Sequence, residues 1–95
     1  MQDDRTLLVF FTSQRSGPAR RMESLLAHIA RKERDHLDVK KVDIDARPDL
    51  AARFGVESVP ALRLVKQRRV VARLDGRVTT PAIEEMIDSH LRVMA

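Results

Sequence analysis

The sequence predicts a small α/β domain with a mixed four-stranded sheet, helices on both faces and the element order β-α-β-α-β-β-α. The 95 residues suffice for one hydrophobic core. Apolar runs of strand length alternate with segments whose apolar residues recur every three or four positions. Serine, threonine or proline stands where most of the helices would begin. We therefore expect residues 1–95 to form a single domain.

The first strand and helix are the clearest elements. Leu7–Phe11 is a continuous apolar run, which is typical of a central strand covered on both faces. After a polar loop, Ser16 is suited to cap a helix and Pro18 to occupy its first turn. Apolar residues then follow at helical spacing: Met22, Leu25, Leu26 and Ile29. The pattern predicts one continuous helix that runs to about Arg34.

A second strand and a second helix follow. Val39–Ile44 alternates apolar and polar residues, as a half-buried strand does. Pro48 marks the start of a helix whose apolar face contains Leu50 and Phe54, and Gly55 ends it. Because a helix joins the first two strands, we expect them to be parallel with a right-handed connection.

The last two strands lie close enough in sequence to form an antiparallel hairpin. They are predicted at Ala61–Val65 and Val70–Leu74, with the chain reversing at Gln67-Arg68. This tip lacks the Asn-Gly pair of a tight turn, so we expect a looser one. The final helix opens at Thr80-Pro81 and repeats apolar residues at intervals of four.

Composition and charge exclude several classes of function. The absence of cysteine excludes disulfides, thiolate metal ligation and thiol catalysis. Three scattered histidines lack metal-ligand spacing, so we expect no metal and no cofactor. The net charge of +4, with fourteen arginines among the 18 basic residues, favours acidic partners. Aromatic residues make up only 3% of the chain, too few for a platform that stacks nucleic-acid bases.

The N-terminal segment predicts the location of the protein. Met1–Arg5 is acidic first, unlike a signal peptide. Leu7–Phe11 is far too short to cross a membrane. We therefore expect a cytoplasmic protein without membrane contact.

An ordered set of motifs resembles the thioredoxin family. The segment Ser16-Gly17-Pro18-Ala19-Arg20 resembles the family's active-site loop, Trp-Cys-Gly-Pro-Cys-Lys. Arg15 stands at the tryptophan, Ser16 at the first cysteine and Ala19 at the second. Further segments match in order: Lys41–Asp45, Phe54–Val56, the cis-proline segment Val59–Leu62 and the groove glycine Gly76. The resemblance covers roughly Leu7 to Leu91, lacks the family's N-terminal strand and helix, and implies a thioredoxin-like fold.

The departures from the family pattern imply that the chain is not an enzyme. Both cysteine positions are occupied by residues without a thiol, Ser16 and Ala19. Phe10 stands where the resemblance places a buried aspartate that serves proton transfer. A serine needs a general base to act as a nucleophile, so we expect Ser16 to be a helix cap instead. The resemblance also implies a cis peptide bond before Pro60.

The parts that remain are those that would shape a binding groove. These residues are Arg15, Gly17, Pro18, Val59, Pro60, Asp75 and Gly76. We therefore expect a redox-inactive module that binds a protein or peptide segment as an added strand beside Val59. Arg15 and Arg20 would favour an acidic segment; Arg21 points elsewhere on the helix and contributes least. The alternative for all three arginines is a solvated helix face.

Two other functions remain open at this stage. The chain is either natural or an engineered oxidoreductase whose cysteines were replaced; Arg15 and Phe10 argue against engineering, which would not require them. The third hypothesis is a basic nucleic-acid accessory protein. Lys66, Arg68 and Arg69 form a basic hairpin tip, for which a solubilising edge is the simpler interpretation. Arg63 interrupts an apolar strand, so we expect it to extend to solvent or to pair with an acidic residue.

Overall fold

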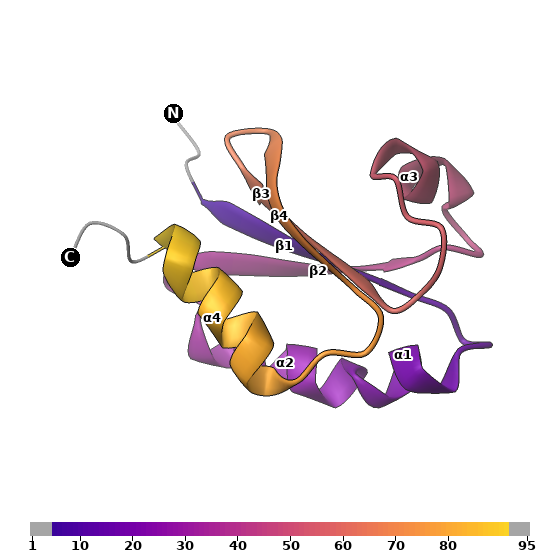
Figure 1. Ribbon diagram of the computed structural model, residues 1–95, viewed down its shortest axis with the longest axis horizontal. Helices are drawn as coiled ribbons and strands as arrows, with labels where there is room; N and C mark the ends of the chain where they lie inside the picture. Colours follow the sequence, from indigo (N-terminus) through magenta and orange to yellow (C-terminus); the bar gives the residue numbers. More distant parts are fainter. Residues whose placement is uncertain (1–4, 92–95) are drawn as a thin grey trace.

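A computed structural model describes residues 5–91 and has the predicted architecture (Figure 1). The elements, in chain order, are β1 (Thr6–Thr12), α1 (Gly17–Arg21), α2 (Glu23–Lys32), β2 (Leu37–Asp43), α3 (Pro48–Arg53), β3 (Ala61–Lys66), β4 (Arg69–Asp75) and α4 (Thr80–Leu91). The sheet order is β2-β1-β3-β4. β1 is parallel to β2 and antiparallel to β3, and β3 and β4 form the predicted hairpin.

β1 is a central strand, and its alternating side chains build a core on each side of the sheet. Leu8 and Phe10 pack with apolar residues of α2 and α4. Val9 and Phe11 pack on the opposite face with residues of α3 and the segment after it. Figure 1 shows α3 on one side of the sheet and α1, α2 and α4 on the other. The prediction of a first strand covered on both faces is confirmed.

The helix expected to run unbroken to about Arg34 is interrupted at Met22. The N–H of Met22 donates to the carbonyl of Ala19 at 3.1 Å, a bond to the third preceding residue that tightens the turn. The side chain of Met22 is buried in the core between sheet and helices. The second helix ends at Lys32, because Glu33 leaves the helical region with φ −107°.

The hairpin tip is tighter than the sequence predicted. Lys66 pairs directly with Arg69, which leaves only Gln67 and Arg68 in the turn. Both residues lie in the left-handed region, with φ of 51° and 68°. Two consecutive left-handed residues match the twist of an antiparallel pair, so the backbone forms a tight turn without the favoured Asn-Gly sequence. The expectation of a looser turn was wrong.

This strained turn yields a stability prediction. The double substitution Gln67→Asn with Arg68→Gly should raise the free energy of unfolding by about 1 kcal/mol, because it removes most of the cost of left-handed backbone at residues with ordinary side chains. Urea denaturation would measure the change. Arg53→Gly, in helix α3, is the control and should lower stability. A loss of stability in the hairpin variant would contradict the left-handed turn.

Candidate functional site: three loops at one end of the sheet

Strand register brings three loops together at one end of the sheet. Phe11 of β1 pairs with Ala61 of β3, and Ala61 pairs with Asp75 of β4. Adjacent strands lie about 4.8 Å apart. The loop after β1, the segment before β3 and the loop after β4 therefore meet on one surface (Figure 1). The predicted groove residues all belong to these three segments or to the first turn of α1.

The segment before β3 has the backbone geometry that the resemblance implied. The Val59-Pro60 peptide bond is cis, as predicted. The N–H of Gly76, whose φ is 84°, donates to the carbonyl of Pro60 at 2.8 Å. Val59 is half-buried, and no hydrogen bond to its main-chain N–H or C=O occurs within residues 5–91. Its backbone is thus available to an added strand.

Ser16 acts as the N-cap of α1. Its hydroxyl accepts a hydrogen bond from the N–H of Ala19 at 3.1 Å, and its backbone is extended. Among the described residues, neither a histidine nor a carboxylate bonds to this hydroxyl. A serine without a base is a poor nucleophile. The geometry therefore favours the structural role over the catalytic one.

The cap should be measurable as stability. Ser16→Ala should lower the free energy of unfolding by about 1 kcal/mol, because the Ala19 N–H loses its acceptor. Ser24→Ala, at an exposed position within α2, is the matched control and should change stability by less than about 0.5 kcal/mol. Equal effects in the two variants would argue against the cap.

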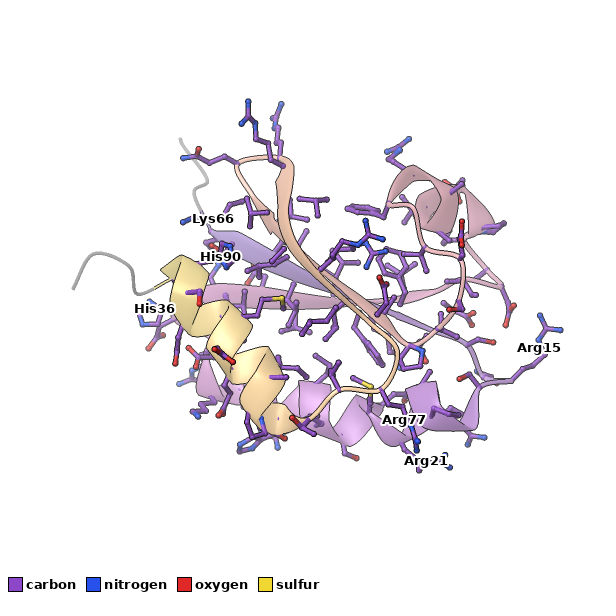
Figure 2. The ribbon with its side chains drawn as sticks, in the orientation of Figure 1. Arg15, Arg21, His36, Lys66, Arg77 and His90 are labelled. Atoms are coloured by element: carbon purple, nitrogen blue, oxygen red, sulfur yellow. The ribbon has the colours of Figure 1, made fainter. Side chains whose placement is uncertain are left out.

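Arg15 is already paired within the chain. Its guanidinium lies 2.8 Å from a carboxylate oxygen of Asp45, whose other oxygen accepts a 2.6 Å bond from the hydroxyl of Ser13. These bonds, the one from Ser13 first and the one from Arg15 second, lower the pKa of Asp45. The Arg15 side chain is 84% exposed and extends away from the body of the molecule in Figure 2. Its charge is compensated, so it is not a free cation facing the groove.

The Asp45 carboxyl offers a direct check of this cluster. Ser13→Ala should move the pKa of Asp45 upward, toward its ordinary value of 3.8, because the largest cause of the lowering is removed. Carboxyl carbon shifts followed by NMR would report the titration. Asp49, whose pKa of about 2 is set mainly by its bond to Arg47, is the internal control. An unmoved Asp45 pKa would exclude the Ser13 bond.

Other arginines carry uncompensated charge near this end. Arg20, Arg21 and Arg77 are exposed and have no ion pair within residues 5–91. The guanidinium of Arg21 folds back over Gly17, where an added Cβ would meet its Nη1 at 3.3 Å. Figure 2 shows Arg21 and Arg77 at the α1 end of the molecule. Arg21 was predicted to contribute least, and Arg77 was not predicted at all, although it directly follows Gly76.

Arg63 is a buried residue that connects the segment after α3 to the end of β4. Its side chain is 1% exposed and donates to the carbonyls of Phe54, Gly55 and Leu62 and, at 2.9 Å, to the carboxylate of Asp75. The expected pairing with an acidic residue is confirmed, but the side chain does not reach solvent. The bond from Arg63 is the largest cause of a lowered pKa at Asp75. Arg63 thereby joins the end of α3 to the end of β4.

The remaining candidate chemistry finds no support in the geometry. Phe10, at the position of the implied aspartate, is 1% exposed and belongs to the apolar core. No cluster of three metal-ligating side chains occurs within the described part of the chain. His28 and His36 are exposed, and His90 is half-buried beside the carbonyl of Met86. No helix within residues 5–91 has the length and apolar character to cross a membrane.

Comparison with known proteins places this architecture. The sequence profile of the thioredoxin family matches residues 1–89. A thioredoxin of Alicyclobacillus acidocaldarius is 36% identical over 92 residues, which cover 97% of this chain and 88% of that protein. A thioredoxin-like protein of Synechocystis sp. is 34% identical over 92% of this chain and 80% of its own length. The crystal structure of a thioredoxin from Nicotiana alata superposes with a TM-score of 0.88 at 31% identity, over 95% of this chain and 76% of that one.

Proposed function

Since the chain belongs to the thioredoxin family and contains no cysteine, we propose that it is a redox-inactive member that binds an extended peptide segment in the groove. The observation that carries the binding role is the free main chain of Val59, beside the cis bond to Pro60. The backbone features predicted for a groove, the cis bond before Pro60 and the left-handed Gly76, are present, whereas the thiol positions carry Ser16 and Ala19.

The lost chemistry involves three positions. Ser16 and Ala19 supply no thiol, so the chain has neither a thiolate to attack a disulfide nor a second thiol to resolve the mixed disulfide. The Ser16 hydroxyl is used by the helix start. Phe10 fills the core where a proton-transfer carboxylate would be needed. These three substitutions support binding rather than turnover as the function.

The binding mode follows from the backbone. An extended segment beside Val59 would exchange main-chain hydrogen bonds with it, which is how β-strand addition provides affinity. The position of Gly76 is also open, since an added Cβ there would meet nothing within 4 Å. The positive charge near the groove comes from Arg20, Arg21 and Arg77 rather than from Arg15, which Asp45 neutralises. An acidic segment is therefore the preferred occupant.

A single introduced thiol would test the groove. The probe is an acidic peptide whose single cysteine is joined to thionitrobenzoate in a mixed disulfide. In Ser16→Cys, the new thiol should attack the peptide sulfur, form a disulfide with the peptide and release thionitrobenzoate. For each variant, the rate with the peptide disulfide is divided by the rate with the mixed disulfide of free cysteine and thionitrobenzoate. This ratio should be at least about tenfold higher for Ser16→Cys than for Arg53→Cys, which places a reference thiol on α3. Release of coloured thionitrobenzoate gives both rates. The division removes differences in intrinsic thiol reactivity between the two sites.

The control peptide has the same charges but prolines at alternate positions. Because proline has no main-chain N–H, this peptide should lose most of the rate advantage if the segment binds as a strand. Equal normalised rates at the Ser16 and Arg53 positions would contradict groove binding. An undiminished rate with the proline peptide would contradict strand addition.

A further inference from the structure

β4 (Arg69–Asp75) is an open edge of the sheet. The strand pairs with β3 on one side only, since the sheet order ends at β4. Five of its seven residues are exposed and the other two are half-buried. An edge strand presents a row of main-chain N–H and C=O groups that another extended chain is able to pair with. The outer edge of β4 is therefore a template for a further strand.

The side chains of this edge include an exposed apolar pair. Val70 and Val71 are 47% and 38% exposed, and they are the only large apolar side chains exposed to this degree in the described part of the chain. Val70 pairs with Val65 across the hairpin, and the register shift at Leu64/Val65 places Val71 outside the regular pairing. β-branched side chains at such a position suit contact with apolar residues of an added strand.

The same edge is strongly basic. Arg68 and Arg69 have no ion pair within residues 5–91, and the side chain of Arg73 is 63% exposed. The single carboxylate of the strand, Asp75, is already held by buried Arg63 at 2.9 Å and contacts Arg73 at 3.4 Å. The edge therefore offers two exposed valines flanked by guanidinium groups, without a free acidic side chain.

From this combination we infer that the outer edge of β4 binds an extended acidic segment of a partner protein, one that carries carboxylates on both of its faces and aliphatic side chains on one. Arg69 pairs with Lys66, whose Nζ donates to the carbonyl of His90 on α4, so Arg69 lies on the α4 side of the sheet. Val70 pairs with Val65, which packs on the α3 side, and Arg73 pairs with Arg63 on that same side. Carboxylates on one face of the added segment would therefore meet Arg69, a carboxylate and aliphatic groups on its other face would meet Arg73 and the two valines, and the main chains would pair.

A second copy of this chain fits less well, because two such strands would bring their arginines together. A nucleic acid has no main-chain amides to pair with β4 and no aliphatic groups to cover Val70 and Val71.

This surface is separate from the groove of the proposed function. The groove depends on Val59 and the loops at the Gly76 end of the strand, whereas the edge depends on residues 69–73 on the side of β4 that faces away from β3. The inference goes beyond the proposed function and does not rest on it. Each site is able to fail in its test while the other holds.

The test uses the isotope-labelled protein and a capped six-residue peptide of glutamate and valine, with glutamates on both faces of the extended chain and valines on one. At low salt, amide shifts should centre on residues 69–73 and weaken as salt rises. An analogue with N-methyl groups on every residue should lose binding, because neither of its edges then has N–H groups to donate to β4. Shifts confined to other elements, or full binding of the N-methylated peptide, would overturn the inference.

Matched charge reversals give the second arm. Arg69→Glu with Arg73→Glu should weaken the peptide at least about tenfold. Arg31→Glu with Arg53→Glu makes the same change in net charge at exposed positions on α2 and α3, and should leave the affinity within about twofold. Equal loss in both double variants would reduce the effect to net charge and overturn the inference. The inference would also be overturned if the protein bound an oligonucleotide of equal charge more tightly than the peptide. Dimers that form without peptide and dissociate in Arg69→Glu with Arg73→Glu would overturn it as well.

Discussion

Phe10→Asp is expected to lower the free energy of unfolding by more than about 4 kcal/mol at pH 7, a large part of the total of about 5–15 kcal/mol that is usual for a domain. Phe10 is 1% exposed and packs within the core between the sheet and helices α2 and α4. A carboxylate there loses the packing of the ring and is removed from water. The family's proton-transfer group therefore cannot be restored by this one substitution.

Two measurements separate the causes of this loss. Phe10→Leu keeps an apolar side chain and should cost about 1 kcal/mol in urea denaturation. Burial raises the pKa of an aspartate, and a group whose pKa is raised on folding contributes its stability below the unfolded pKa and loses it as pH rises. The Phe10→Asp variant should thus lie closer to the parent near pH 4 than at pH 7. Equal deficits at both pH values would contradict a buried carboxylate.

Arg63→Ala is expected to lower the free energy of unfolding by about 3 kcal/mol. The substitution leaves the carbonyls of Phe54 and Gly55 without the donor they have in the parent, and it creates a cavity where the buried Arg63 side chain was. It also frees the carboxylate of Asp75. Because these contacts connect α3 to β4, the groove residues at the end of β4 should become more mobile.

Arg73→Ala is the matched control for Arg63→Ala. Arg73 pairs with Arg63 across the two strands and contacts the same carboxylate, but its side chain is 63% exposed. Its removal should cost less than about 1 kcal/mol. Similar losses in the two variants would contradict the view that burial makes Arg63 important.

The acid limb of stability should change in Arg63→Ala as well. The pKa of Asp75 is lowered from 3.8 on folding, with Arg63 as the first cause. A group of this kind contributes stability above its unfolded pKa and loses it as pH falls through the folded pKa. The parent should therefore lose more stability than Arg63→Ala as pH falls below about 4. Parallel pH profiles would exclude this contribution.

The sequence was sufficient for the architecture because its patterns are local. The unbroken apolar run of the first strand predicted burial on both faces, and proline and serine located two helix starts within a residue or two. The resemblance to the thioredoxin family predicted the cis bond before Pro60, and the Val59-Pro60 bond is cis. The thioredoxin-like fold is confirmed by the family match and by the solved structures.

Features that depend on contacts between distant residues were less accessible. Arg15 pairs with Asp45, which lies 30 residues further along the chain, in the loop after β2. No local pattern near Arg15 predicts this pairing. The break at Met22 reflects a hydrogen-bond shift in a sequence that favours helix throughout. The tight turn at Gln67-Arg68 is imposed by the pairing of the flanking strands, which overrides the preference of the two residues.

The main-chain N–H of Val59 provides the most direct test of the central claim, that this chain without redox-active thiols binds an extended peptide beside Val59. The isotope-labelled Arg69→Glu/Arg73→Glu protein, in which the β4 edge no longer attracts acidic segments, would be titrated with an acidic linear peptide selected against that variant from a random library, while amide shifts and hydrogen exchange are followed. The account predicts that the Val59 amide shifts and that its exchange slows on binding, because the free N–H gains an acceptor. A peptide that binds tightly while the amides of Val59 and Gly76 remain unchanged would contradict it.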